Sequence, residues 1–179
     1  SPMRRGIDTL HKKFGTRTAV ICGDYLLSIS LRMISSAFEN DNTPENRMVN
    51  LLSRLCLGEL NQHINNGNYS LSPIQYLKII AGKTASLFEA TFFMGAYMNK
   101  SDKSVLAKYS RVGRYIGMIF QLTDDCMDFE TTEDIAGKPV QSDYDKNVIT
   151  LPIIYALRTS ETFYKEACSG SLSVEDVKK

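Results

Sequence analysis

Histidine and cysteine are scarce in this chain of 179 residues, which has two histidines and four cysteines. The cysteines are widely spaced and show neither the paired spacing of a zinc site nor the density of a disulfide scaffold. His11 and His63 have no neighbours in the sequence that would complete a ligand set. The sequence therefore gives no reason to expect a zinc site, and it favours reduced cysteines.

The chain also lacks a strong excess of either charge, because 21 Lys and Arg residues against 20 Asp and Glu residues leave a formal net charge of +1. This balance gives no reason to expect nucleic-acid binding or electrostatic adhesion to a membrane. No uninterrupted apolar run reaches the length of a membrane span, and no leader is recognisable, so we expect no membrane span and a cytoplasmic location. The chain begins at Ser1 without an initiator methionine, and we expect it to be incomplete at both ends.

Alternation typical of strands is missing, whereas apolar residues recur at helical spacing along most of the chain. The length and a hydrophobic content of 43% fit one soluble globular domain over residues 1–179. Ser72 followed by Pro73 is typical of a helix N-terminus. We predict an all-α antiparallel bundle around a central cavity. The expected helices cover 16–38, 45–64, 73–98, a stretch from 101 or 102 to 128, and 152–157, with a loop over 131–147.

Three aspartates crowd one predicted helix. Asp124 and Asp128 are four residues apart and Gln121 precedes Asp124 by three, so these side chains project to one side, with Asp125 beside them. Like charges at this spacing repel, and a hard cation between them would relieve the repulsion. Mg²⁺ favours one or two carboxylates together with water and phosphate oxygens. From the aspartates alone, a magnesium site and a solvated acidic helix face remain equal alternatives.

The residues around these aspartates form a longer ordered pattern that resembles the second aspartate-rich region of the trans-prenyl diphosphate synthases. Two further blocks agree with that family, one from Arg4 to Ser28 and one from Tyr76 to Ala96. The chain is most similar to the bacterial-type medium- and long-chain polyprenyl synthases. The matching residues are Gly117, Phe120, Gln121, Asp124, Asp125, Asp128, Gly137, Lys138, Asp143, Thr150, Leu151 and Pro152.

The resemblance implies an isoprenoid-synthase bundle that works as a symmetric homodimer. It implies a prenyltransferase that condenses an allylic prenyl diphosphate with isopentenyl diphosphate and releases diphosphate. Mg²⁺ would be held by Asp124, Asp125 and Asp128. The product could bring about peripheral membrane association.

The resemblance also assigns roles to basic and polar residues. Lys83, which by itself would be expected to extend to solvent, would contact the allylic diphosphate. Thr84 and Gln121 would lie beside the carbon where positive charge develops. Arg4 would serve the allylic diphosphate and Arg5 isopentenyl diphosphate, since guanidinium matches phosphate oxygens.

Lys138, in a Gly-Lys turn, would be a further diphosphate donor. The chain departs from the family at Val148, where a lysine is common, and it begins after the position of the family's first aspartate-rich motif. An alternative is therefore a non-catalytic subunit of a heteromeric prenyl synthase. In the family, the residues that limit product length lie upstream of the position that Ser1 matches.

Overall fold

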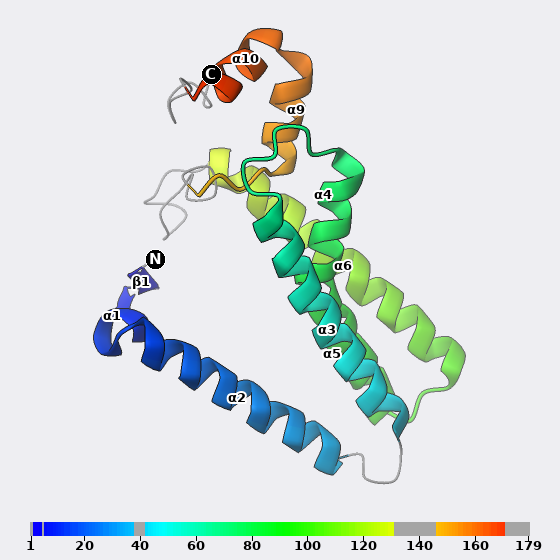
Figure 1. Ribbon diagram of the computed structural model, residues 1–179. Helices are drawn as coiled ribbons and strands as arrows, with labels where there is room; N and C mark the ends of the chain where they lie inside the picture. The colour runs from blue at the N-terminus through cyan, green and yellow to red at the C-terminus, as the bar shows by residue number, and fades with distance from the viewer. Residues whose placement is uncertain (1, 5, 38–41, 131–145, 171–179) are drawn as a thin grey trace. The chain divides into compact units, whose positions relative to one another are not determined.

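The computed structural model describes residues 2–4, 6–37, 42–130 and 146–170 of the chain. Helices make up most of these residues, which confirms the all-α prediction (Figure 1). The chain divides into two compact units, Ser1–Val49 and Asn50–Lys179.

The first unit opens with two short antiparallel strands, β1 (Met3–Arg4) and β2 (Ile7–Asp8). Gly6 lies between them at a φ of 74°, a left-handed conformation that costs glycine little. Two residues are too few for a strand to show alternation, which explains why the sequence did not reveal this pair. Arg4 lies exposed on β1, opposite Ile7.

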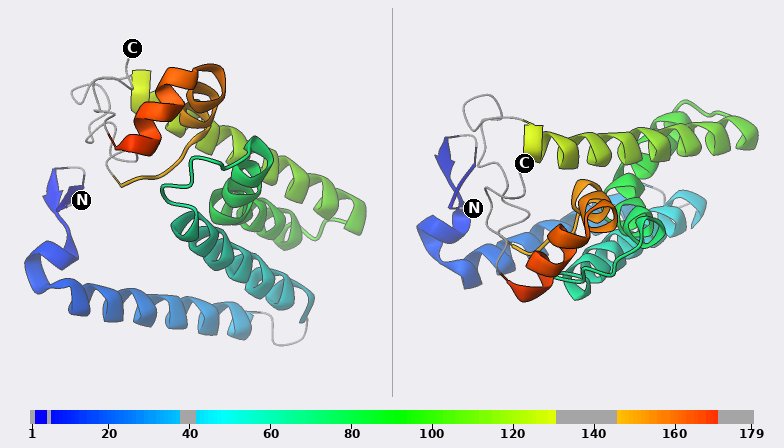
Figure 2. Two further views of the ribbon diagram at one scale, coloured as in Figure 1. Left: turned by 45° about the horizontal axis from the view of Figure 1, so that its top comes forward. Right: turned by 90° about the horizontal axis from the view of Figure 1, so that it is seen from above.

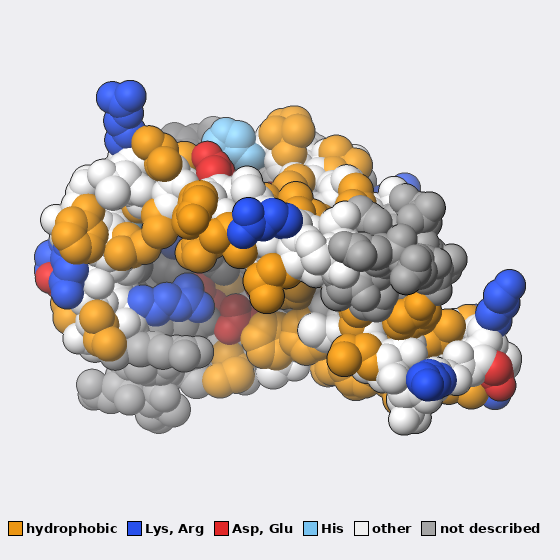
Figure 3. Space-filling view, turned by 90° about the horizontal axis from the view of Figure 1, so that it is seen from below, with side chains coloured by type: hydrophobic (Ala, Val, Ile, Leu, Met, Phe, Trp, Pro, Cys, Tyr) orange, Lys and Arg blue, Asp and Glu red, His pale blue; other side chains and the backbone are white. Residues whose placement is uncertain are grey.

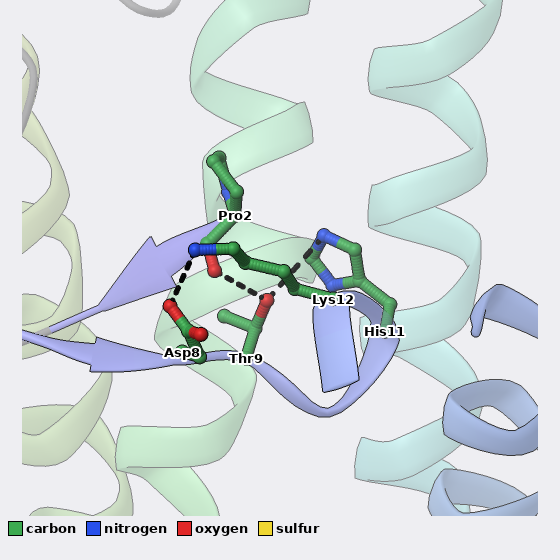
Figure 4. Close-up of polar contacts among 5 residues, drawn as sticks. All are labelled: Pro2, Asp8, Thr9, His11 and Lys12. Carbon is green, nitrogen blue, oxygen red and sulfur yellow. Dashed lines mark hydrogen bonds and ion pairs between the residues drawn. The ribbon is translucent and has the colours of Figure 1, made fainter. Parts of the chain in front are cut away.

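Polar contacts fasten the strand pair to the short helix α1 (Leu10–Phe14). Thr9 donates from both its backbone N and its Oγ1 to the carbonyl oxygen of Pro2, at 3.0 and 2.9 Å. Lys12 Nζ lies 2.6 Å from Asp8 Oδ1 (Figure 4). Gly15 then reverses the chain at a φ of 84° and leads into α2 (Thr16–Ala37).

Helix α2 has an apolar surface that the first unit does not cover. Leu26 is 57% exposed and Met33 is 66% exposed. Residues 16–36 are long and apolar enough to cross a membrane by length and composition alone, and none of this stretch is buried; a single such helix is weak evidence for a span. Hydrophobic side chains are visible across the face drawn in space-filling form (Figure 3).

Helix α3 (Asn42–Ile64) contains the boundary between the two units and ends at the predicted residue. The predicted helix over 73–98 is continuous, but it consists of α4 (Pro73–Ile80), a π-helical turn η1 (Ala81–Ala85) and α5 (Ser86–Met98) (Figure 2). Ser72 caps α4 as predicted: its Oγ accepts from Gln75 N at 3.2 Å, and Gln75 Oε1 accepts from Ser72 N at 2.9 Å.

Helix α6 (Lys103–Glu130) returns along α5 and makes the most extensive helix packing among the described residues. Asp102 begins it by accepting from Val105 N at 2.8 Å. The chain continues, after residues outside the described part, in α9 (Leu151–Thr159) and α10 (Glu161–Ser169). Helix α10 was not predicted, and most of the loop predicted over 131–147 lies outside the described residues.

The core of the second unit joins α4, α9 and α10. Ile153 and Ile154 are 2% and 1% exposed, and they pack with the apolar side chains of α4 and of the segment before α9. This packing holds the end of α4 beside α6, and the polar residues of the candidate site lie where these two helices meet. The buried cluster consists of Leu71, Tyr76, Ile79, Ile80, Ile149, Ile153, Ile154, Leu157 and Ala167.

Candidate active site

The π-helical turn η1 carries Lys83 and Thr84 and lies unusually close to α3. A Cβ added at Gly58 of α3 would be 2.2 Å from the backbone N of Lys83, and a Cβ at Gly82 would be 2.9 Å from the carbonyl oxygen of Arg54. Only glycines permit this approach of two backbones. π turns insert one extra residue into a helix and occur often at functional sites. The turn therefore places Lys83 and Thr84 where a regular helix would not.

Helix α6 approaches η1 from another direction through a third glycine. A Cβ at Gly117 would be 2.7 Å from Ala85 Cα. Gln121 follows Gly117 by one helical turn, so it projects from the same face toward η1. The close approach of the backbones explains how the side chains of Gln121 and Thr84 can touch.

The polar side chains at this junction form one connected hydrogen-bond network. Thr84 Oγ1 donates to Gln121 Oε1 at 2.6 Å, and Gln121 Nε2 donates to Asp125 Oδ1 at 2.7 Å. Tyr76 of α4 donates its hydroxyl to the other oxygen of the same carboxylate, Asp125 Oδ2, at 2.5 Å. Tyr76 and Asp125 are each 3% exposed. The network thus links three helical segments, α4, η1 and α6.

The sequence prediction that Gln121 and the aspartates share one side of a helix agrees with this arrangement. Asp125 and Asp128 are buried at 3% exposure each, whereas Asp124 is half-buried. A carboxylate that is removed from water is costly unless hydrogen bonds or a cation compensate. The burial of two neighbouring carboxylates on one helix argues against a fully solvated acidic face.

The donor set fits a hard divalent cation in its chemistry, since all three aspartates supply oxygen. The described residues contain no group of three or more acidic, His or Cys side chains close enough together to hold a metal ion. Mg²⁺ needs only one or two protein carboxylates when water and phosphate oxygens complete its shell. The site therefore fits Mg²⁺ carried with a diphosphate better than a closed structural metal centre.

Lys83 is oriented by α3. Its Nζ donates to Gln62 Oε1 at 2.8 Å and lies 3.3 Å from Glu59 Oε2. With its side chain 29% exposed, it retains access to solvent. Neither partner could be predicted from the sequence, because both come from a helix about 20 residues away and no local pattern links them to Lys83.

A small cavity of about 30 Å³, large enough for a water molecule, lies among these residues. Lys83, Gln121 and Asp125 line one part of it, and Val148 and Thr150 line another. Val148, the position where the family commonly has lysine, is 9% exposed. The buried, apolar Val148 side chain therefore leaves this wall of the cavity uncharged, whereas a lysine would have placed a positive charge there.

Not every predicted site residue can be compared with this junction. Arg5 and Lys138 lie outside the described residues. Arg4 belongs to the first unit and is exposed on β1. Of the predicted residues, the structure brings together Thr84, Gln121 and Asp125 by direct hydrogen bonds, and it adds Tyr76, which the sequence analysis did not single out.

Comparison with known proteins decides the family. The family model described as polyprenyl synthetase matches residues 1–179, the whole chain. The chain belongs to the polyprenyl synthetase family.

Individual relatives agree with this assignment. The chain is 34% identical over 156 residues to heptaprenyl diphosphate synthase component 2 of Bacillus subtilis, a match covering 87% of this chain and 44% of that protein. Nonaprenyl diphosphate synthase of Mycobacterium tuberculosis is 30% identical over 160 residues, with 88% and 46% covered. The chain thus spans about half the length of the curated relatives it matches.

Solved structures support the fold of this polyprenyl synthetase chain. Heptaprenyl diphosphate synthase from Staphylococcus aureus superposes with a TM-score of 0.90 at 34% identity, covering 99% of this chain and 56% of that one. A polyprenyl synthase from Caulobacter crescentus, complexed with calcium and isoprenyl diphosphate, gives 0.87 at 26% identity, covering 99% and 55%.

Proposed function

We propose that the complete protein containing this chain is a prenyltransferase, which condenses an allylic prenyl diphosphate with isopentenyl diphosphate to give a longer trans-polyprenyl diphosphate. The observation that carries the proposal is the hydrogen-bond network Thr84–Gln121–Asp125. It includes one residue of the acidic face of α6, which Asp124, Asp125 and Asp128 form. The network brings together a carboxylate that can bind a hard cation, Asp125, and two oriented dipoles, Thr84 and Gln121. The reaction requires groups of both kinds.

In the proposed reaction the C–O bond of the allylic substrate breaks and diphosphate leaves as an anion. The double bond of isopentenyl diphosphate then forms a C–C bond with the allylic carbon, and a proton passes to the released diphosphate. Bound Mg²⁺ would neutralise the leaving group, with Asp124, Asp125 and Asp128 as the residues to hold it. The Caulobacter relative, which contains calcium and isoprenyl diphosphate, supports a divalent ion and a prenyl diphosphate in this fold.

The chain's own residues would bind, orient and shield the reactants. Lys83 would contact the allylic diphosphate, and its exposure of 29% leaves its ammonium accessible. Arg4, Arg5 and Lys138 would complete the diphosphate contacts. Thr84 and Gln121 would direct oxygen dipoles toward the developing cation, and such preorganised dipoles are a large source of rate acceleration.

Aromatic side chains next to the network would provide an apolar wall. The rings of Phe88 and Phe120 have centroids 5.4 Å apart. Phe88 follows Thr84 by one helical turn and Phe120 adjoins Gln121, so both belong to the same neighbourhood. Aromatic faces attract cations and also exclude the water that would quench an allylic cation.

We expect the whole protein to be catalytic without a different subunit and to form a homodimer in the cytoplasm. A second candidate is a subunit that is active only with a partner. The similarity to a protein named heptaprenyl diphosphate synthase component 2 favours keeping this alternative.

Both candidates can be tested with radiolabelled isopentenyl diphosphate, Mg²⁺ and a series of allylic diphosphates as primers. Incorporation of label into extractable prenyl product by the purified complete protein would support the first candidate, and chromatography would give the product length. Incorporation that appears only when a co-expressed partner is present would favour the second. Absence of product in both cases would refute the proposed activity.

A further inference from the structure

Tyr76 is buried in α4 and is not among the residues to which the sequence pattern gives a role. Its ring belongs to the apolar core, but its hydroxyl leaves that core and donates to Asp125 Oδ2 at 2.5 Å. A core that needed only an aromatic ring at this position would be served by phenylalanine without a polar group to satisfy. The hydroxyl therefore has a specific partner on the acidic helix.

The chemistry of this partner determines the direction of the whole network. An ionised carboxylate only accepts hydrogen bonds, so Asp125 requires the amide nitrogen of Gln121 to face it. The Gln121 carbonyl oxygen must then point the other way, where Thr84 Oγ1 donates to it at 2.6 Å. A fixed carboxylate thus fixes the orientation of the glutamine amide and of the threonine hydroxyl.

We propose that Tyr76 is a positioning residue for prenyl transfer, which locks the Asp125 carboxylate and through it the Gln121 amide and the Thr84 hydroxyl. This inference rests on the proposed function. Tyr76 touches neither substrate nor metal in it. Without the tyrosine hydroxyl, the carboxylate can rotate about its bond to Cβ, and Gln121 loses its defined orientation. Residues that orient the ligands of a site in this way typically contribute about 10–100-fold to metal affinity or activity.

The test compares Tyr76→Phe with Tyr69→Phe in the complete protein. Tyr69 is a matched control because it is half-buried and packs against the same core, and its hydroxyl makes no hydrogen bond to another described residue. We expect Tyr76→Phe to lower kcat by about 10–100-fold, with the KM for isopentenyl diphosphate within about twofold of the parent. Tyr69→Phe should match the parent. A kcat within about twofold of the parent for Tyr76→Phe, or an equal fall in both variants, would overturn the proposal.

A second readout does not depend on turnover. Mg²⁺ together with inorganic diphosphate should raise the thermal midpoint of the parent and of Tyr69→Phe, because ligands that bind the folded state stabilise it. The rise should be smaller for Tyr76→Phe, since a loosened Asp125 weakens the acidic face; an equal rise would contradict the proposal. This comparison remains informative if the parent makes no prenyl product, so failure of the proposed function is distinguishable from failure of this inference.

Asp125→Asn examines the same network if Tyr76→Phe does not fold, and it also removes a carboxylate that we assign to Mg²⁺, so its informative outcome is unchanged turnover. The asparagine oxygen can still accept from Tyr76, but its amide nitrogen would then face the Gln121 amide nitrogen, and two donors repel. Gln121 should turn away from Asn at this position and kcat should fall by a similar factor. Turnover equal to that of the parent would show that the orientation of Gln121 does not matter and would overturn the proposal.

Discussion

Replacing Gly58 with alanine should destabilise the protein and displace Lys83, although alanine is the better helix former. The added Cβ would lie 2.2 Å from Lys83 N and 2.6 Å from Gly82 C, whereas ordinary contacts begin at 3.4 Å. Both neighbours are backbone atoms, so no side chain can rotate out of the way. Helix α3 and the π turn η1 must separate by about 1 Å to relieve the overlap.

The expected size follows from two opposing terms. Alanine gains about 1 kcal/mol in helix propensity over glycine, while overpacking of this kind typically costs about 1–3 kcal/mol. Because backbone meets backbone, we expect the upper part of that range and a net loss of about 1–2 kcal/mol. On the scale of a domain of 150–250 residues such a loss lowers the thermal midpoint by about 2–8 °C, and the shift is smaller in the longer complete protein.

Gly95 is the matched control. It lies exposed in α5, and a Cβ there would meet nothing within 4 Å in the described residues. Gly95→Ala should therefore raise the midpoint by about 2–4 °C, the effect of propensity alone. Calorimetry on the complete protein measures the change in thermal midpoint, and steady-state assays measure the change in kcat. Since a misplacement of about 1 Å can cost up to about 100-fold in rate, Gly58→Ala should also lower kcat. A Gly58→Ala protein as stable as Gly95→Ala would refute the close approach of α3 and η1.

Two further predictions concern the substrates and the isolated chain. Lys83→Ala should raise the KM for the allylic diphosphate more than that for isopentenyl diphosphate, and Arg5→Ala should do the reverse; equal changes in both constants would show that the two roles are assigned wrongly. The 179-residue chain expressed alone should incorporate no labelled isopentenyl diphosphate and should associate with rising concentration in sedimentation experiments, because the apolar surface of α2, including Leu26 and Met33, is exposed. A soluble monomer with activity equal to that of the complete protein would contradict both statements.

Local chemistry explains which helices could be predicted from the sequence. Ser72 with Pro73, and Asp102 three residues before Val105, are capping signals that act within one turn, and the structure confirms both starts. The strands β1 and β2 were missed because two residues are too few for a periodic pattern. Helix α10 was missed although it is as long as α9, whose start Pro152 indicated. Ser160 caps α10 by accepting from Phe163 N at 3.2 Å, a signal that the sequence does carry.

The candidate site was only partly predictable, because its geometry depends on contacts between distant segments. The spacing of Gln121 and the aspartates along one helix predicted their shared side. Nothing local indicated the π turn, whose position depends on the approach of Gly58 to Gly82. Tyr76 carried one weak signal, since it precedes Lys83 by seven residues and so by about two helical turns, but its hydrogen bond to Asp125 spans 49 residues.

If the acidic face of α6, formed by Asp124, Asp125 and Asp128, takes part in ionising a prenyl diphosphate, turnover must depend on it, and turnover of Asp124→Asn in the complete protein at saturating Mg²⁺ measures this directly. Asp124 is half-buried next to two buried carboxylates, so the loss of one charge relieves repulsion and should leave the thermal midpoint nearly unchanged. Because metal-assisted charge neutralisation contributes several kcal/mol to such a reaction, kcat should fall by about 100-fold or more. A kcat within a few-fold of the parent would contradict the role of this face.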